Sequence, residues 1–380
     1  MNPGCLGVFS IKKVLFLIPN LKHGGAEKVL VNLVNNLDRE KYEVTVQTLF
    51  DVGIHRNKLA SHVRYLPGLP VQFRGNSHFL KLFSATFLWN WLVKEHYDIA
   101  VSYLEGPTSR ILSGCRDPET KRIAWLHIEL NSPSLAAQGF QNPAEARAAY
   151  NSFDRLVAVS SNVRDSFLQN LDIRTPIDIL YNTNETEEIL DKASVSPDDP
   201  RFSGDGLRVC SVAKLMKAKG FDRLLNVHKR LLDEGLSHKI YILGIGEEQH
   251  RLEQKIRAYG LEDSFLLLGF KENPYQYVSR CDLYVCSSLR EGFSTAVTEA
   301  LVVGTPVVST NCSGAKELLG EHNEYGLVVE NSEDGIYSGM KRMLSEPALL
   351  AHYKQKAARR GSFFSREQTV KAVEEMLDHL

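Results

Sequence analysis

The chain has 380 residues, of which 43% are hydrophobic and 24% are charged, and its formal net charge is −1. These values exclude a disordered or strongly charged chain, and the length suggests two domains with a full core each. No apolar stretch is long enough to span a bilayer. Residues 1–10 lack the basic start and long apolar core of a signal peptide, so we expect a dispensable extension there.

The distribution of charge and the spacing of the cysteines limit the expected binding partners and cellular compartment. Residues 1–183 contain 20 Lys and Arg against 16 Asp and Glu, whereas residues 184–380 contain 25 against 30. The positive excess of the first half suits an anionic acceptor or membrane surface, but it is modest and equally fits ordinary variation. No nucleic-acid partner is indicated. Six cysteines show no Cys-x-x-Cys pair or zinc spacing, so we expect reduced core thiols in a cytosolic protein.

Short apolar runs alternate with helical patterns along the chain, which predicts parallel sheets covered by helices on both faces. The rhythm pauses over residues 184–206, a polar, acidic and proline-containing stretch that is typical of a linker. We therefore expect an α/β protein with Rossmann-like domains at 1–183 and 207–364, facing each other across a cleft. The expected strands are 13–18, 43–49, 98–103, 122–126, 155–159, 178–181, 207–213, 239–243, 264–268, 282–286 and 306–309. The expected helices are 25–37, 78–95, 161–170, 218–233, 247–259, 274–279 and 295–303.

The first strand runs into a loop that contains Gly24 and Gly25. Adjacent glycines let the backbone approach a ligand closely, and the following helix presents its N-terminus there, so the loop could line a diphosphate or acceptor site. A plain strand-to-helix turn is the alternative. The loop has neither Gly-x-Gly-x-x-Gly nor Walker A spacing, so neither of those nucleotide motifs is indicated.

The expected helix 78–95 is unusually apolar. Its helical spacing predicts one core-facing stripe, whereas Trp89 and Lys81 fall off that stripe. A helix that touches a membrane is the alternative. The residues of the stripe are Leu80, Phe83, Phe87 and Trp91.

Polar residues follow several expected strands of the first half. Glu105 and His127 each end a strand, and Asn182 ends another. Because ligands bind at the carboxyl ends of parallel strands, we expect Glu105 and Asn182 near an acceptor. His127 should point to the mouth of the cleft, with a purely structural histidine as the alternative.

The second half offers cations and glycine turns at its strand ends. Lys214 and Lys219 follow the strand 207–213, where fixed positive charges could stabilise a departing diphosphate; solvated loop lysines are the alternative. Gly244 ends the next strand as a weak Gly-x-Gly signal. Phe270 follows the strand 264–268 and is either a core residue or a stacking partner for a base.

The most informative stretch surrounds Glu291 and Glu299. An apolar strand (282–286) runs into a polar loop with Glu291, and a helix then starts near Ser294 or Thr295. A helix start offers unpaired N–H groups and a positive dipole end, which suit a phosphate. Glu299 lies about 6 Å further along the helix, so a ribose could sit beside it and a sugar beside Glu291. This layout suits a nucleotide-sugar.

The Glu-x7-Glu segment resembles the signature of family-4 retaining glycosyltransferases, which have the two-domain GT-B fold, and the likeness extends over nearly the whole chain. The Gly-Gly-Ala-Glu sequence at 24–27 is similar to a subgroup that builds surface polysaccharides. The resemblance implies that the last helix, 365–380, crosses back to the first domain. It also implies that Lys214 and Lys219 bind the donor diphosphate, that Gly244 and Phe270 lie near the nucleotide, and that His127 contacts the donor sugar.

The resemblance further implies transfer of a hexose or N-acetylhexosamine from a UDP-sugar, with retention at the anomeric carbon. Glu291 would orient the donor sugar and Glu299 would hold the ribose, which leaves no carboxylate pair of the glycosidase kind. No Asp-x-Asp occurs in the sequence, so we expect no metal and no cofactor. The acceptor would be a glycan or a lipid-linked glycan, and the location cytoplasmic with peripheral contact at the inner membrane face.

Two other functions share parts of this pattern. A UDP-sugar epimerase or a phosphorylase would have the same fold, but such proteins lack the combination of Gly-Gly-Ala-Glu with Glu-x7-Glu. A non-catalytic binding partner would not need Glu291, Lys214, Lys219 and Glu299 together. Release of free UDP on adding acceptors would separate the transferase from both.

Overall fold

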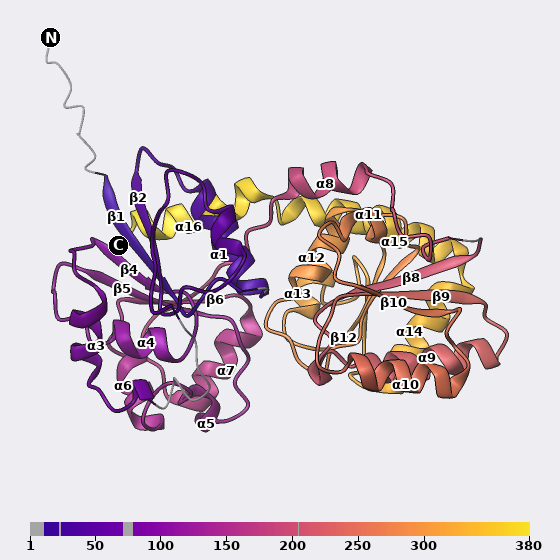
Figure 1. Cartoon of the computed structure of the whole chain (residues 1–380), viewed down its shortest axis with the longest axis horizontal. Helices are drawn as coiled ribbons and strands as arrows, with labels where there is room; N and C mark the ends of the chain where they lie inside the picture. The colour runs from indigo at the N-terminus through magenta and orange to yellow at the C-terminus, as the bar shows by residue number, and fades with distance from the viewer. Residues whose placement is uncertain (1–10, 23, 71–78, 204) are drawn as a thin grey trace, which may run out of the picture. The chain divides into compact units, whose positions relative to one another are not determined.

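The computed structural model describes residues 11–22, 24–70, 79–203 and 205–380, so the expected extension 1–10 lies outside the described residues. The chain divides into two compact units, residues 1–183 with 369–380 and residues 184–368. Each unit contains a sheet of parallel strands with helices on both faces (Figure 1). The expectation of two Rossmann-like domains is therefore confirmed.

The first unit has a seven-stranded sheet in the order β3-β2-β1-β4-β5-β6-β7. The order reverses next to β1, as in doubly wound folds whose ligands bind at that switch point. The edge strand β3 was not predicted, because its three half-exposed residues carry no apolar run. The strands are β1 (Lys12–Ile18), β2 (Tyr42–Thr48), β3 (Arg64–Leu66), β4 (Ile99–Ser102), β5 (Lys121–Leu126), β6 (Arg155–Ala158) and β7 (Ile177–Ile179).

Helices cover both faces of this sheet, which is why β1 is an unbroken apolar run. The side chains of β1 from Val14 to Ile18 are all buried, whichever face they point to. The helices of the unit are α1 (Gly25–Asn36), the 3₁₀ turn η1 (His55–Lys58), α3 (Ala85–Leu92), α4 (Pro107–Leu112), α5 (Pro133–Ala136), α6 (Pro143–Tyr150), α7 (Ser161–Leu171) and most of α16 (Arg366–Asp378).

The C-terminal helix α16 is part of the first unit from Thr369 onward. Its end lies against the start of the sheet: Lys12 Nζ donates to the carbonyl of Leu377 at 2.8 Å, and the Tyr42 hydroxyl donates to Asp378. Val370, Val373, Met376 and Leu377 bury its apolar face. The last helix therefore completes the core of a domain whose other elements come from the start of the chain.

The prediction for residues 78–95 was wrong in its bounds and in its buried face. The helix α3 begins only at Ala85, where the Ser84 side chain caps it by accepting a hydrogen bond from the Phe87 N–H at 3.1 Å. Leu88 and Trp89 are buried, whereas Phe87 and Trp91 are about half exposed. The turn before Ser84 interrupts the helical phase, so a stripe that runs through 80 and 83 does not continue along α3.

The second unit has a six-stranded sheet in the order β10-β9-β8-β11-β12-β13, with the same reversal next to its first strand. Its core lies between the sheet and the helices α9, α10 and α14, which Figure 1 shows on one side of the strands. The edge strand β13 was not predicted. The strands are β8 (Leu207–Val212), β9 (His238–Leu243), β10 (Phe265–Gly269), β11 (Leu283–Cys286), β12 (Val307–Thr310) and β13 (Leu327–Val329).

Nine helical elements, counted over the described residues, accompany this second sheet. On the side opposite α9 and α10, helices α12 and α15 pack against each other. The elements are α8 (Thr186–Ser194), the 3₁₀ turn η2 (Lys217–Lys219), α9 (Phe221–Asp233), α10 (Gln249–Tyr259), α11 (Tyr275–Val278), α12 (Thr295–Val302), α13 (Ala315–Leu319), α14 (Glu333–Ser345) and α15 (Pro347–Phe363).

The segment 184–206, which we expected as a linker, contains the helix α8 and belongs to the second unit. Ile189 and Ala193 of α8 pack against Tyr275 and Val302. Further along, Asp199 forms ion pairs with Arg201 at 2.6 Å and with Lys271 at 2.9 Å. The acidic composition of this stretch is thus used in contacts with its own domain.

Two expectations drawn from composition can be compared with the described residues. Over those residues, no helix combines the length and the apolar character needed to cross a bilayer. The cysteines among them are free thiols, and Cys115, Cys210, Cys281 and Cys286 are buried.

Candidate functional site

The corner between β11 and α12 in the second unit is built as the sequence predicts. The helix starts at Thr295, and Ser294 caps it: its Oγ accepts from the Val297 N–H at 3.4 Å, and its carbonyl accepts from the Thr298 hydroxyl at 3.1 Å. The side-chain cap satisfies one of the N–H groups that a helix start leaves unpaired. The N–H groups ahead of Val297, including that of Thr295, lie where an anion would bind.

Glu291 lies in the loop before this helix and is paired with Lys219. Lys219 Nζ is 2.6 Å from Glu291 Oε1, and the Ser288 hydroxyl donates to the same oxygen at 2.6 Å. Burial acts to lower the pKa of Lys219, but the charge and hydrogen bond of Glu291 outweigh burial, and the pKa is raised. The ammonium therefore stays charged, as a diphosphate-binding cation must.

The backbone under this pair is tightly fixed. The Ser287 hydroxyl donates to the Lys219 carbonyl at 2.8 Å, and the Thr310 hydroxyl donates to the Ser288 carbonyl at 2.6 Å. Gly220 has φ of 65°, and a Cβ there would lie 2.2 Å from the Ser287 carbonyl oxygen. The glycine thus lets the two loops approach, which places the Lys219 and Glu291 side chains within contact.

Glu299 lies one turn inside α12 and is 8% exposed. The Tyr275 hydroxyl donates to its Oε1 at 3.3 Å. Carboxylate oxygens accept hydrogen bonds from hydroxyl groups, as this contact shows. Nothing in the sequence indicated Tyr275 as its partner, because α11 is a single short turn 24 residues upstream.

Lys214 and Gly244 lie at adjacent strand ends. The N–H of Leu215 donates to the Ile245 carbonyl at 3.0 Å, and a Cβ on Gly244 would lie 2.0 Å from the Ala213 carbonyl oxygen. Gly244 also has φ of 144°, which favours glycine. Close approach of the two loops is the physical reason for this glycine, and Lys214 projects from the contact as an exposed cation.

Phe270 follows β10 and is 55% exposed, so it is not a core residue. Gly269 before it has φ of 75°, and its carbonyl accepts from the Gly244 N–H at 2.8 Å. This bond joins the Phe270 turn to the Gly244 turn. Lys214, Gly244 and Phe270 therefore lie on neighbouring loops at the carboxyl ends of β8, β9 and β10.

In the first unit, Glu105 and His127 come together at the ends of β4 and β5. Glu105 Oε1 accepts the N–H of Ile128 at 2.7 Å and that of His127. Burial raises the pKa of Glu105 to about 7, against the opposing effect of these bonds, and burial lowers the pKa of His127 to about 3. The imidazole is therefore neutral near pH 7, and within the described residues its buried Nε2 has no hydrogen-bond partner.

The glycine pair of the first unit stands at the start of α1. Gly24 precedes the helix and Gly25 opens it, and a Cβ on Gly24 would lie 1.8 Å from Glu27 Oε2. Burial raises the pKa of Glu27, whose carboxylate folds back over the loop. Glu27 was not among the predicted site residues, although it belongs to the Gly-Gly-Ala-Glu sequence at 24–27. Asn182 is buried at the end of the same unit.

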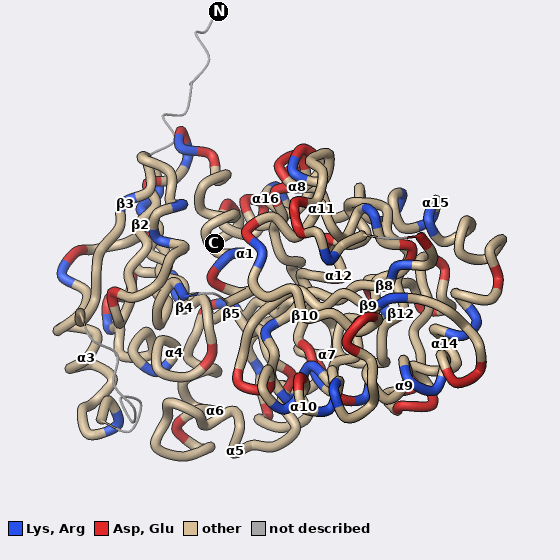
Figure 2. Tube along the Cα trace, turned by 45° about the vertical axis from the view of Figure 1, so that its right-hand side comes forward, with Lys and Arg blue, Asp and Glu red and all other residues tan. Residues whose placement is uncertain are grey.

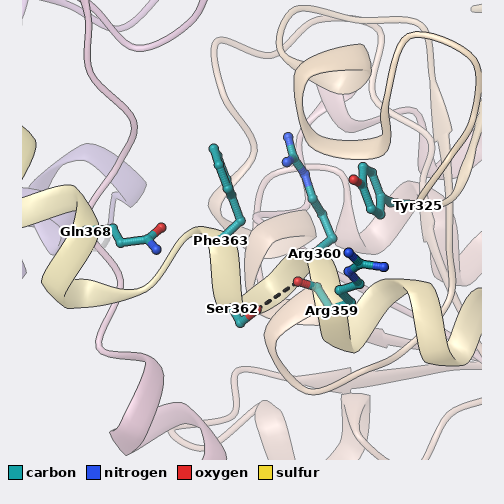
Figure 3. Close-up of a pocket in the computed structure, with 6 residues that line it drawn as sticks. All are labelled: Tyr325, Arg359, Arg360, Ser362, Phe363 and Gln368. Carbon is teal, nitrogen blue, oxygen red and sulfur yellow. Dashed lines mark hydrogen bonds between the residues drawn. The ribbon is translucent and has the colours of Figure 1, made fainter.

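A pocket of the second unit lies outside this set of residues. Figure 3 shows its lining at the end of α15, where Arg360 Nε donates to the Leu318 carbonyl at 3.0 Å and Ser362 donates to the carbonyl of Arg359. The residues that line the pocket are Tyr325, Arg359, Arg360, Ser362, Phe363 and Gln368.

No group of three or more His, Cys, Asp or Glu in the described part of the chain could hold a metal ion.

Comparison with known proteins assigns the family. The model of Glycosyltransferase Family 4 matches residues 23–188, and the model of Glycosyl transferases group 1 matches residues 195–360. The chain belongs to the family-4 glycosyltransferases. The two matches approximately follow the two units, and the second includes Lys219, Glu291 and Glu299.

Individual relatives agree with this family. A Campylobacter jejuni N-acetylgalactosamine-N,N'-diacetylbacillosaminyl-diphospho-undecaprenol 4-alpha-N-acetylgalactosaminyltransferase is 28% identical over 97% of this chain and 100% of its own. The putative colanic acid biosynthesis glycosyltransferase WcaL of Escherichia coli is 33% identical over 37% of each chain. Among solved structures, Anabaena HepE in complex with UDP and glucose has a TM-score of 0.78 at 21% identity, covering 97% of this glycosyltransferase and 100% of HepE.

Proposed function

We propose that this glycosyltransferase moves a hexose or N-acetylhexosamine from a UDP-sugar to a glycan acceptor, with retention at the anomeric carbon, in the synthesis of a surface polysaccharide or glycoconjugate. The observation that carries the proposal is the Lys219–Glu291 pair beside the capped start of α12. Lys219 supplies a cation to this corner, Glu291 a carboxylate, and the start of α12 its N–H groups.

Each residue of the corner has a role that follows from its chemistry. Lys219 and the N–H groups at Ser294–Thr295 would bind the diphosphate and stabilise the charge that develops as it leaves. Glu291 would accept hydroxyl hydrogens of the donor sugar, and Glu299 those of the ribose. Lys214 would contribute a second cation from the neighbouring strand end. Retention would follow if the acceptor attacks from the face that the diphosphate leaves, with a phosphate oxygen taking its proton.

The donor and acceptor classes are supported by the relatives. The Campylobacter relative is named for transfer of N-acetylgalactosamine to an undecaprenol-linked glycan, and the Escherichia coli relative for colanic acid synthesis. HepE was crystallised with UDP and glucose. A lipid-linked acceptor would bring the enzyme to the surface of a membrane.

A donor screen tests the proposal. Thermal shift with UDP-, GDP- and ADP-sugars should give stabilisation by the UDP-sugars, and free UDP should be released when a glycan acceptor is added. Because the diphosphate contacts come from lysines and a helix start, we expect the same rate in excess chelator. A rate abolished by chelator and restored only by manganese would contradict the metal-independent part of the proposal. If the protein bound UDP-sugars but released no UDP with any acceptor, it would be a non-catalytic binding protein.

A further inference from the structure

An exposed aromatic patch lies on the first unit, formed by Phe79, Leu82, Phe87 and Trp91. Their exposed fractions are 50%, 78%, 52% and 48%. Phe83 joins them: its ring stacks on Phe87 at 5.3 Å between centroids and meets Phe79 edge-on at 5.4 Å. The rings of Phe79, Phe83 and Phe87 therefore form one apolar surface, and Leu82 and Trp91 are exposed on the same segment. Exposed apolar patches of this kind mark interaction sites.

Hydrogen bonds from the rest of the first unit fix the backbone of the segment that carries the patch. The guanidinium of Arg110 is buried and donates to the carbonyls of Leu80 at 3.1 Å and Phe83 at 2.9 Å, while its Nε pairs with Glu145 at 2.8 Å. The Gln141 amide donates to the Lys81 carbonyl at 3.2 Å. The buried guanidinium of Arg110, paired with the partly buried Glu145, thus fixes the turn that presents the aromatic side chains.

The opposite side of the same segment is anchored in the core. Leu88, Trp89 and Val93 are buried, and a Cβ on Gly114 would lie 2.2 Å from the Ala85 carbonyl carbon, so α3 and α4 are in close contact. Within the described part of the chain, one face of the helix is therefore packed, and Phe87 and Trp91 are exposed on the other. An apolar rather than polar outer face is unusual for a surface helix.

The charged residues of this segment indicate which kind of surface the patch binds. From residue 52 to residue 94 the sequence has six Lys and Arg and no Asp or Glu. Two of these cations, Arg56 and Arg64, form ion pairs with Asp51 and Glu95, which border the range. The helix α3 carries no charged residue and is tan throughout in Figure 2. In the sequence, Lys81 lies between Phe79 and Leu82, and Lys94 follows Trp91 by three residues. Aromatic and apolar side chains bordered by lysines are the chemistry that binds the interface of an anionic bilayer.

We propose that Phe79, Leu82, Phe87 and Trp91 dock this enzyme on an anionic lipid surface, with Lys81 and Lys94 facing the headgroups. The proposal deepens the proposed function, since a lipid-linked acceptor would be presented at such a surface. The rings of Phe87 and Trp91 would enter the headgroup boundary, and the core contacts of Leu88 and Trp89 would remain unchanged.

Vesicle co-sedimentation of the full chain tests the docking without any glycosyl transfer. The protein should bind vesicles of phosphatidylcholine with phosphatidylglycerol more strongly than phosphatidylcholine alone. Loss of two exposed aromatic rings in the Phe87→Ser/Trp91→Ser variant should weaken binding at least about tenfold. The matched control Leu168→Ser/Leu190→Ser removes two exposed leucines elsewhere and should bind like the unmodified chain. Lys81→Glu with Lys94→Glu should remove the preference for anionic vesicles.

Tryptophan emission gives a second readout. Of the three tryptophans, Trp89 and Trp125 are buried and only Trp91 is exposed, so a blue shift on adding vesicles should disappear in Trp91→Phe while sedimentation persists. Equal vesicle binding by the Phe87→Ser/Trp91→Ser variant and its control would overturn the proposal. So would a concentration-dependent dimer that this variant abolishes, because the patch would then join two copies. Transfer to a water-soluble acceptor is measured separately, so failure of docking and failure of the transferase function are distinguishable.

Discussion

The Lys219–Glu291 pair is formed before any donor arrives. Its atoms are 2.6 Å apart, and Ser288 fixes the same carboxylate oxygen. A prearranged cation lowers the cost of gathering charge around a leaving diphosphate. The sequence predicted both residues as candidates but not their contact, because 72 residues separate them and only the approach of two loops at Gly220 joins them.

Removing the cation should affect the chemical step. We expect Lys219→Met to lower kcat by about a hundredfold to a thousandfold, since it deletes a group that stabilises charge in the transition state. The matched control Lys217→Met removes an exposed lysine of the same turn and should retain the rate. Steady-state kinetics with a saturating UDP-sugar check this. Equal rates for the two variants would place the diphosphate elsewhere.

Glu105 makes stability depend on pH. Its pKa in the fold is about 7, above the ordinary 4.5, so the fold favours the protonated carboxyl. The stability that this preference contributes is complete below about pH 4.5 and is lost as pH rises through 7, a loss on the order of 1–3 kcal/mol. Glu105→Gln keeps the acceptor oxygen and cannot ionise. The Tm of the variant minus that of the unmodified chain should therefore be larger at pH 8 than at pH 5. If this Tm difference were the same at both pH values, the raised pKa of Glu105 would be refuted.

At the scale of elements, alternation of apolar runs with helical patterns predicted eleven of the thirteen strands in the described residues, because strands covered on both faces are mostly apolar. Of the three strands with only three residues, β7 was predicted, whereas β3 and β13 were not. The segment 78–95 failed for another reason: the turn ahead of Ser84 resets the helical phase, and no periodicity argument locates such a turn. The helix start predicted near Ser294 or Thr295 is confirmed, and the structure shows that Ser294 caps it.

The close approach at Gly220 can be isolated by a matched pair of substitutions. Gly220 and Gly260 both have φ of 65°, but only Gly220 has a neighbour, the Ser287 carbonyl oxygen, where a Cβ would stand. Each change to Ala should cost about 1–2 kcal/mol for the left-handed backbone. Gly220→Ala should cost more, and it should also weaken UDP binding because the Lys219 loop must shift. Thermal denaturation and UDP titration measure both effects, and equal results for the two variants would contradict the role given to the contact.

At the scale of the whole molecule, the two units differ in whether one continuous segment of the chain forms them. The second unit is continuous from residue 184 to 368, whereas the first needs α16 from the far end of the sequence. The hydrogen bonds of Lys12 to Leu377 and of the Asp38 N–H to Glu374 tie that helix to the first sheet. The resemblance to GT-B proteins indicated this return, and no local pattern in 365–380 could have done so.

Deletion of residues 369–380 should therefore destabilise the first unit selectively. The deletion exposes the β1–β2 side and removes the buried Val373 and Leu377. Limited proteolysis should cut within residues 11–183 first, while UDP still protects the second unit against thermal unfolding. Loss of UDP protection together with the first unit would show that the units do not fold independently.

A crystal structure with bound UDP tests the central claim most directly. We predict the diphosphate beside Lys219 and the N–H groups at Ser294–Thr295, with the ribose hydroxyls donating to Glu299. A nucleotide bound away from the β11–α12 corner, with the Lys219–Glu291 pair undisturbed, would contradict the account.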